Sequence, residues 1–275
     1  MQNSPWSHAR QSGVSDDVDF EIKGQELQFC EIELDPGESA VAEAGAMVWK
    51  DASVEMTTVF GDGSAKEGGF MDKMLGAGKR LVTGESLFTT VFTHNGHGKA
   101  RVAFGAPVPG IILPIKLDSV GGTLICQKDS FLAAAKGVEI GIAFQKRVLT
   151  GLFGGEGFIM QKLSGDGWVF VQMGGMVIER ELKPGEELHV DTGCIAAMTS
   201  DVDFDLQTVG SVKSMLFAGE GVFFARLRGP GKVWIQSLPF SRLAGRMLAA
   251  AKPKSGENRG EGSALGTLGD IIGGN

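Results

Sequence analysis

The sequence predicts an all-β protein of three tandem β-sandwich repeats in a pseudo-threefold arrangement, followed by a short C-terminal helix. A Gly-Glu pair that leads into an apolar strand occurs three times, at Gly84-Glu85, Gly155-Glu156 and Gly219-Glu220. Each pair is followed 12 residues later by a hairpin glycine, at Gly96, Gly167 and Gly231. Landmarks at fixed spacing indicate one supersecondary unit that is used three times.

Composition agrees with a glycine-rich β protein and restricts the function classes. The chain has 275 residues, 42 of them glycine, which favours many tight turns over long helices. A net charge of −7 argues against a large nucleic-acid surface, which needs clustered Lys and Arg. Three widely spaced cysteines without a CxxC pair are typical of reduced, buried thiols in a cytosolic protein.

The first repeat is predicted over 16–103, after a loose N-terminal tail over 1–15. Its strand over 27–34 alternates apolar and polar residues, as a half-buried strand does. Pro36-Gly37 then predicts a type II turn, because proline presets one central position and glycine supplies positive φ at the next. Further strands are expected over 39–42, 47–49 and 54–56.

An insertion over 57–83 distinguishes the first repeat from the other two. Its apolar residues fall at helical spacing, and we expect them to form an interaction surface: Phe70, Met71, Met74 and Leu75. Methionine-rich surfaces adapt to protein partners. With Lys73, Lys79 and Arg80 nearby, segment 66–83 could instead rest on an anionic membrane surface, or pack as a helix on its own repeat.

The second repeat is predicted over 104–174 and the third over 175–240. Their turn glycines, Gly121 and Gly185, each precede the next Gly-Glu glycine by 34 residues, whereas Gly37 precedes Gly84 by 47. A short helix follows over 241–251, where Ser241 can act as N-cap. The tail over 252–275 is rich in Gly and Ser and is predicted to be flexible.

These residues carry a family resemblance. The Pro-Gly-Glu turn, the Ala44-Gly45-Ala46-Met47 segment and the later Gly-Glu strand resemble the mitochondrial-biogenesis AIM family (altered inheritance of mitochondria) over about 18–240. The resemblance implies three β-sandwich units like the subunit of the trp RNA-binding attenuation protein, without its RNA activity. The acidic N-terminal region lacks features of a transit peptide, so we expect a cytoplasmic bacterial relative, either free or peripheral to a membrane.

Three glutamates are candidates for a ligand site. Glu85, Glu156 and Glu220 occupy equivalent positions, and pseudo-threefold symmetry could bring them together around a cation. The alternative is structural, with each carboxylate beginning its strand and accepting backbone N–H groups or forming a local salt bridge.

Other polar residues are better explained by structure. His94 and His97 flank Asn95-Gly96 and are predicted to lie at a solvated hairpin tip, while His189 lacks companion metal ligands. Cys194 is predicted to be a buried thiol. The glycine-rich stretch 151–157 lacks the Gly-Lys-Ser/Thr ending of a phosphate loop.

The sequence therefore predicts a non-enzymatic β-rich scaffold or protein-interaction module that forms a homo-oligomer. No catalytic set, resident metal or cofactor is expected, and nucleic acid is not an expected partner. Two alternatives remain open: a small-ligand or metal-binding protein that uses the junction between repeats, and peripheral membrane association through 66–83.

Overall fold

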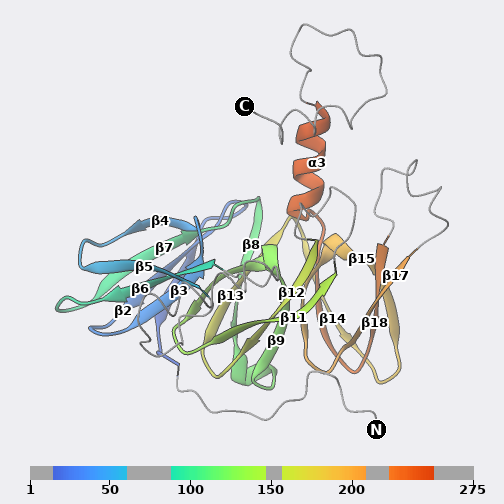
Figure 1. Cartoon of the computed structure of the whole chain (residues 1–275), viewed down its shortest axis with the longest axis horizontal. Helices are drawn as coiled ribbons and strands as arrows, with labels where there is room; N and C mark the ends of the chain where they lie inside the picture. The colour runs from blue at the N-terminus through green and yellow to red at the C-terminus, as the bar shows by residue number, and fades with distance from the viewer. Residues whose placement is uncertain (1–14, 61–87, 147–156, 209–222, 251–275) are drawn as a thin grey trace, which may run out of the picture.

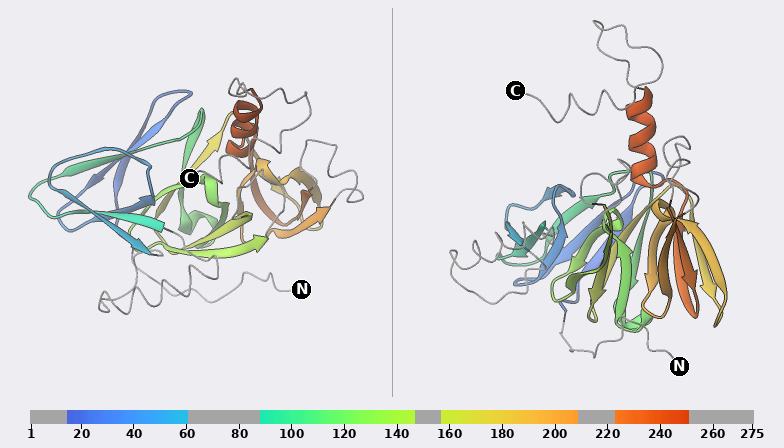
Figure 2. Two further views of the ribbon diagram at one scale, coloured as in Figure 1. Left: turned by 45° about the horizontal axis from the view of Figure 1, so that its top comes forward. Right: turned by 45° about the vertical axis from the view of Figure 1, so that its right-hand side comes forward.

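The computed structural model describes residues 15–60, 88–146, 157–208 and 223–250, and this part of the chain is nearly all β (Figure 1). Its strands form antiparallel sheets of four, six, six and three strands. A short C-terminal helix, α3 (Phe240–Ala250), ends the described part, as the sequence predicts. In Figures 1 and 2 this helix projects away from the sheets.

The strands fall into three successive sets along the chain. Set 1 contains β1 (Asp19–Lys23), β2 (Phe29–Leu34), β3 (Ser39–Glu43), β4 (Met47–Lys50), β5 (Val54–Phe60), β6 (Phe88–His94) and β7 (Ala100–Gly105). Set 2 contains β8 (Gly110–Lys116), β9 (Thr123–Gln127), β10 (Phe131–Ala135), β11 (Glu139–Lys146), β12 (Phe158–Ser164) and β13 (Trp168–Gly174). Set 3 contains β14 (Val177–Leu182), β15 (Glu187–Asp191), β16 (Ile195–Thr199), β17 (Asp203–Thr208), β18 (Phe223–Arg228) and β19 (Gly231–Gln236). Short 3₁₀ turns η1 (Leu117–Val120), η2 (Lys128–Ser130) and η4 (Thr192–Cys194) connect strands of sets 2 and 3.

The strand pairings within the sets follow one pattern. Strand β7 lies between β2 and β4, β13 lies between β8 and β10, and β19 lies between β14 and β16. Likewise, β6 lies between β3 and β5, β12 between β9 and β11, and β18 between β15 and β17. A register shift recurs at the same place in β4, β10 and β16, which aligns Trp49 with Ala133 and Ala197.

Two further pairings join the sets into continuous sheets. Strand β3 of set 1 pairs antiparallel with β10 of set 2, and β9 of set 2 pairs antiparallel with β16 of set 3. Set 2 therefore lies between the other two, as Figures 1 and 2 show. Because β1 has no counterpart in sets 2 and 3, β3 corresponds to β9 and to β15. Each joining pairing unites this strand of one set with β10 or β16 of the next.

The hydrophobic cores cross the boundaries between the sets. The core around Ile32, Phe92 and Phe104 also contains Leu132 and Phe170 from set 2. A second core centred on set 2 includes residues from both neighbours, and a third lies mainly in set 3. Because each core contains side chains from more than one set, packing and strand pairing stabilise the same junctions.

The turns that follow β2, β8 and β14 contain glycine in the backbone conformation that the sequence predicts. Gly37, Gly121 and Gly185 have φ angles of 93°, 81° and 80°, the left-handed region that glycine adopts without steric cost. The turn landmarks used to align the sequence therefore have the same backbone conformation.

By contrast, the predicted equivalence of Gly96 with the hairpin glycine Gly231 is wrong. Strand pairing places Ala100 opposite Leu34 and Gly231 opposite Leu182, so Ala100, and not Gly96, corresponds to Gly231. The connection between β6 and β7 is longer than its counterpart in set 3. Constant spacing to Gly96 was therefore a coincidence of sequence.

Candidate functional site

Two of the strands at the ends of the sheets, β4 and β15, have an edge without a partner in the described part of the chain, whereas their counterparts in the other sets are paired on both edges. β4 is the last strand of the sheet β1-β2-β7-β4, and β15 is the first strand of the sheet β15-β18-β17. β10 and β16 correspond to β4, and β3 and β9 correspond to β15. All four of those corresponding strands are used in joining pairings. The free edges of β4 and β15 therefore correspond to the two edges that pair with each other at each internal junction.

Strand β4 is exposed although its counterparts are buried. Every residue of β10 and β16 is buried. In β4 the exposed fractions are 37% for Met47, 57% for Val48 and 36% for Trp49. An apolar strand edge of this kind is a template for pairing with another strand.

Strand β15 differs from its counterparts in the same way. The first four residues of β3 and the last four of β9 are buried, but in β15 this holds for Val190 alone. His189, Glu187 and Asp191 are exposed, and the two carboxylates form ion pairs with Arg226 and Arg242 at 3.7 Å. The two edges are therefore complementary in strand position.

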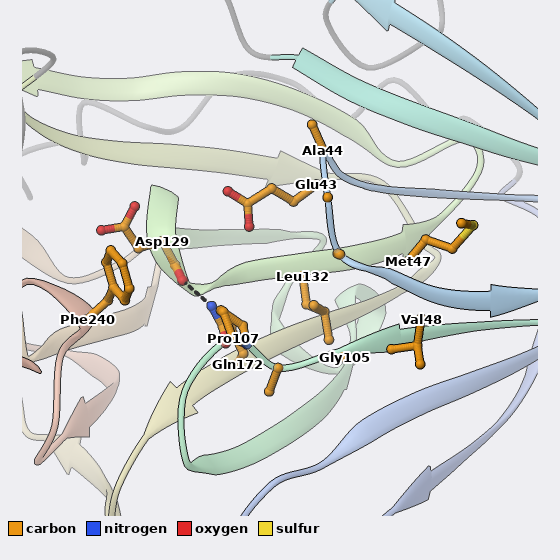
Figure 3. Close-up of a pocket in the computed structure, with 13 residues that line it drawn as sticks. Glu43, Ala44, Met47, Val48, Gly105, Pro107, Asp129, Leu132, Gln172 and Phe240 are labelled. Atoms are coloured by element: carbon orange, nitrogen blue, oxygen red, sulfur yellow. Dashed lines mark hydrogen bonds between the residues drawn. The ribbon is translucent and has the colours of Figure 1, made fainter. Parts of the chain in front are cut away.

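A pocket of about 470 Å³ lies where sets 1 and 2 meet (Figure 3). Its polar lining includes Glu43 at the end of β3, Asp129 in η2 and Gln172 in β13. The apolar lining comes from β4, the segment after β7, β10 and the start of α3: Met47, Val48, Pro107, Leu132 and Phe240. In Figure 3 the side chain of Glu43 extends toward η2.

Glu43 is the carboxyl group in this pocket with a perturbed acidity. Burial, followed by the charge of Asp129, raises the pKa of Glu43 to about 7, and the charge of Lys128 opposes both effects. Its neighbour Gln172 is only 3% exposed and donates its Nε2–H to the backbone oxygen of Asp129. The Oε1 atom of Gln172 has no hydrogen-bond partner among the described residues.

Most residues predicted from the sequence to form a site lie outside the described residues. This holds for Glu85, Glu156 and Glu220 and for the insertion residues Phe70, Met71, Met74 and Leu75. Their convergence and their role as a surface remain predictions. The described residues contain no group of three or more His, Cys, Asp or Glu side chains placed to hold a metal ion.

The prediction for His94 was wrong, because this residue is buried rather than solvated. His94 ends β6 and is 0% exposed, whereas His97 is exposed. Its Nε2 lies 2.9 Å from the backbone oxygen of Gly98, and its Nδ1 accepts the backbone N–H of Gly96 at 3.3 Å. The long connection folds back over the imidazole, which anchors the hairpin.

The cysteines and His189 are the remaining residues for which the sequence favours a structural role. Cys30, Cys126 and Cys194 are free and buried, as expected. Burial raises the pKa of all three thiols, which keeps them protonated and unreactive. Trp234 is buried, and Trp168 is half-buried and packs edge-on against Phe20. His189 stands on the β15 edge against the ring of Phe224.

Comparison with known proteins identifies the family. The family model described as Mitochondrial biogenesis AIM24 matches residues 20–238. The chain belongs to this family. A relative described as an uncharacterized protein (M6_Spy0233) of Streptococcus pyogenes serotype M6 is 28% identical over 229 residues, which are 82% of this chain and 87% of the relative.

A solved structure shares the fold. The crystal structure of protein SPYM3_0169 from Streptococcus pyogenes superimposes with a TM-score of 0.68 at 23% identity, covering 85% of this chain and all of that one. At this identity the likeness concerns the fold alone. In the described part of the chain, no helix has the length and apolar character needed to cross a bilayer.

Proposed function

We propose that the protein is a non-enzymatic β-rich scaffold that assembles with copies of itself through the edges of β4 and β15. The observation that carries this proposal is the joining pairing. It occurs twice inside the chain and leaves one copy of each participating edge without a partner among the described strands. In this proposal the strand sets are three tandem β-sandwich repeats, each like the subunit of the trp RNA-binding attenuation protein.

The internal junctions define the expected geometry between copies. Ala133 pairs with Ala42, and Ala197 pairs with Cys126. Transferring this register places Trp49 of one copy opposite Val190 of the next, and Lys50 opposite His189. The strands run antiparallel, as they do at both internal junctions.

This contact is heterologous, since it joins two different surfaces. Heterologous contacts produce a closed ring when the rotation between copies closes, and a filament when it does not. Closure pairs the β4 and β15 edges of every copy and removes the tendency of β4 to pair with unrelated strands. A scaffold role follows, because the proposed assembly needs no catalytic residues and orders many copies in a fixed geometry.

The test is the native mass of the full chain. We expect native mass spectrometry to give a defined integer multiple, above one, of the 29.0 kDa chain mass. Val48→Asp places a charge in the proposed contact and should give monomers. Leu27→Asp is the matched control, because Leu27 is similarly exposed but lies in the turn before β2.

Two results contradict the proposal. One is a wild-type protein that is monomeric at all accessible concentrations. The other is a Val48→Asp variant that keeps the wild-type mass while Leu27→Asp does the same. Membrane association through 66–83 is a separate proposal, which depends on residues outside the described part.

A further inference from the structure

At the junction between sets 2 and 3, the buried polar side chains have hydrogen-bond partners. Gln236 is the counterpart of Gln172, and Gln127 is the counterpart of Glu43. Gln236 donates its Nε2–H to the backbone oxygen of Gly193 at 3.1 Å and lies 3.4 Å from Oε1 of Gln127. The Oε1 of Gln236 accepts the backbone N–H of Gly174 at 2.9 Å. Both ends of this buried amide are therefore paired.

The junction between sets 1 and 2 lacks one of these hydrogen bonds. Gln172 makes the equivalent bond to the Asp129 backbone oxygen, but its Oε1 has no partner among the described residues. Strand register aligns Gly105 with Gln172, and continuing two residues further aligns Pro107 with Gly174. Proline has no backbone N–H, so the donor that Gly174 supplies is missing where Pro107 stands.

The charge of the pocket defines what can replace that donor. Where the second junction has the neutral Gln127, the first has Glu43, with Asp129 also lining the pocket. A buried acceptor without a donor costs free energy. The ionised form of Glu43 is also destabilised, because the effects of burial and of the Asp129 charge exceed that of the nearby Lys128 charge. One cationic group that donates hydrogen bonds relieves both costs.

The remaining walls of the pocket are apolar. Met47 and Val48 come from β4, Leu132 from β10 and Phe240 from the start of α3. A volume of about 470 Å³ is much larger than an ammonium ion and lies within the usual range for organic ligands. A ligand with an apolar substituent beside its charged group fits both parts of the lining.

We propose that this pocket binds a primary ammonium group that carries a short apolar substituent. The ammonium donates hydrogen bonds to Oε1 of Gln172 and to the carboxylate of Glu43, and the substituent packs between Met47, Val48 and Phe240. Divalent metal is disfavoured, because the described residues supply no cluster of three ligating side chains. Burial and the charge of Asp129 raise the pKa of Glu43 to about 7 against the opposing charge of Lys128, and a bound cation lowers it again.

The test is calorimetric titration of the full-length protein, in its native assembly, with hexylammonium chloride at pH 8. We expect saturable binding at one site per chain, with a Kd on the order of 0.1–1 mM for a ligand of this size. Hexanol and hexanoate share the apolar chain but lack the cation, and should not bind measurably. Absence of saturable hexylammonium binding, or equal binding of hexanol, overturns the proposal.

Two variants locate the site. Glu43→Gln copies the second junction and should weaken hexylammonium binding by about tenfold to a hundredfold, because a charge-assisted hydrogen bond is lost. Pro107→Ala restores a backbone N–H for Gln172 and should weaken binding by about threefold to tenfold. Glu181→Gln changes an exposed carboxylate of β14 and is the matched control. Unchanged affinity in Glu43→Gln places the ligand elsewhere and refutes this site, whatever Pro107→Ala does.

Discussion

Replacing Glu43 by glutamine should make the protein more stable at alkaline pH. Burial and the charge of Asp129, opposed by Lys128, raise the pKa of this carboxyl from 4.5 to about 7 in the folded state. The folded chain therefore binds more protons than the unfolded chain between those pH values, and the free energy of unfolding falls as pH rises through that window. A shift of this size corresponds to about 3 kcal/mol of lost stability above pH 7, at about 1.4 kcal/mol per pKa unit.

Glu43→Gln removes this loss, because glutamine is neutral at every pH and resembles the Gln127 side chain of the second junction. We expect equal stability of variant and wild type near pH 4.5. Above pH 7 the variant should be more stable by about 2–3 kcal/mol, or roughly 5–10 °C in Tm for a chain of this length. The sign is unusual, since most carboxyl groups in proteins stabilise the folded state as they ionise.

The assay is thermal unfolding of both proteins at one chain concentration, without added amine, from pH 4.5 to 8.5. Other titrating groups affect both proteins equally, so the difference in Tm isolates Glu43. The control Glu181→Gln should follow the wild-type curve throughout. A Tm difference that stays constant across this pH range would refute the reasoning.

Three further predictions follow from buried polar groups and thiols. His94→Ala should lower the free energy of unfolding by about 2–3 kcal/mol, because the substitution leaves the Gly98 oxygen and a backbone N–H unpaired. Chemical denaturation measures this free energy. The control His97→Ala should change the free energy of unfolding by less than about 0.5 kcal/mol. Asp16→Ala should cost about 1–3 kcal/mol in the same assay, because the buried Ser39 N–H loses its acceptor carboxylate. The three cysteines should resist alkylation by iodoacetamide in the native protein and react fully in denaturant; rapid native labelling would contradict their burial.

The sequence was sufficient for the β class, the turns and the C-terminal helix. Turn glycines such as Gly37 and Gly185 have local conformational requirements that sequence spacing reveals directly. His94 was misjudged, because Asn95-Gly96 looks like a tight hairpin tip. Its burial depends on how the longer connection folds, which no local pattern encodes.

The candidate sites can be recognised only when the strand pairing is known. Aligned sequences show Met47-Val48-Trp49 beside strands of similar character in the other sets, and all three segments look like core. Only the pairing shows that β4 has lost the neighbour that covers β10 and β16. The pocket is similar, since the missing donor at Pro107 becomes visible only when strand register aligns that residue with Gly174.

The assembly through β4 and β15 is tested most directly by disulfide cross-linking at the expected register. The double variant Lys50→Cys with His189→Cys places two thiols opposite each other, at a Cα separation of about 5 Å that suits a disulfide. The pair Lys50→Cys with Glu187→Cys is displaced by two residues and serves as control. We predict a ladder of disulfide-linked chains on a non-reducing gel for the first pair and little cross-linking for the second; monomers for both pairs, or equal ladders, would contradict the proposed assembly.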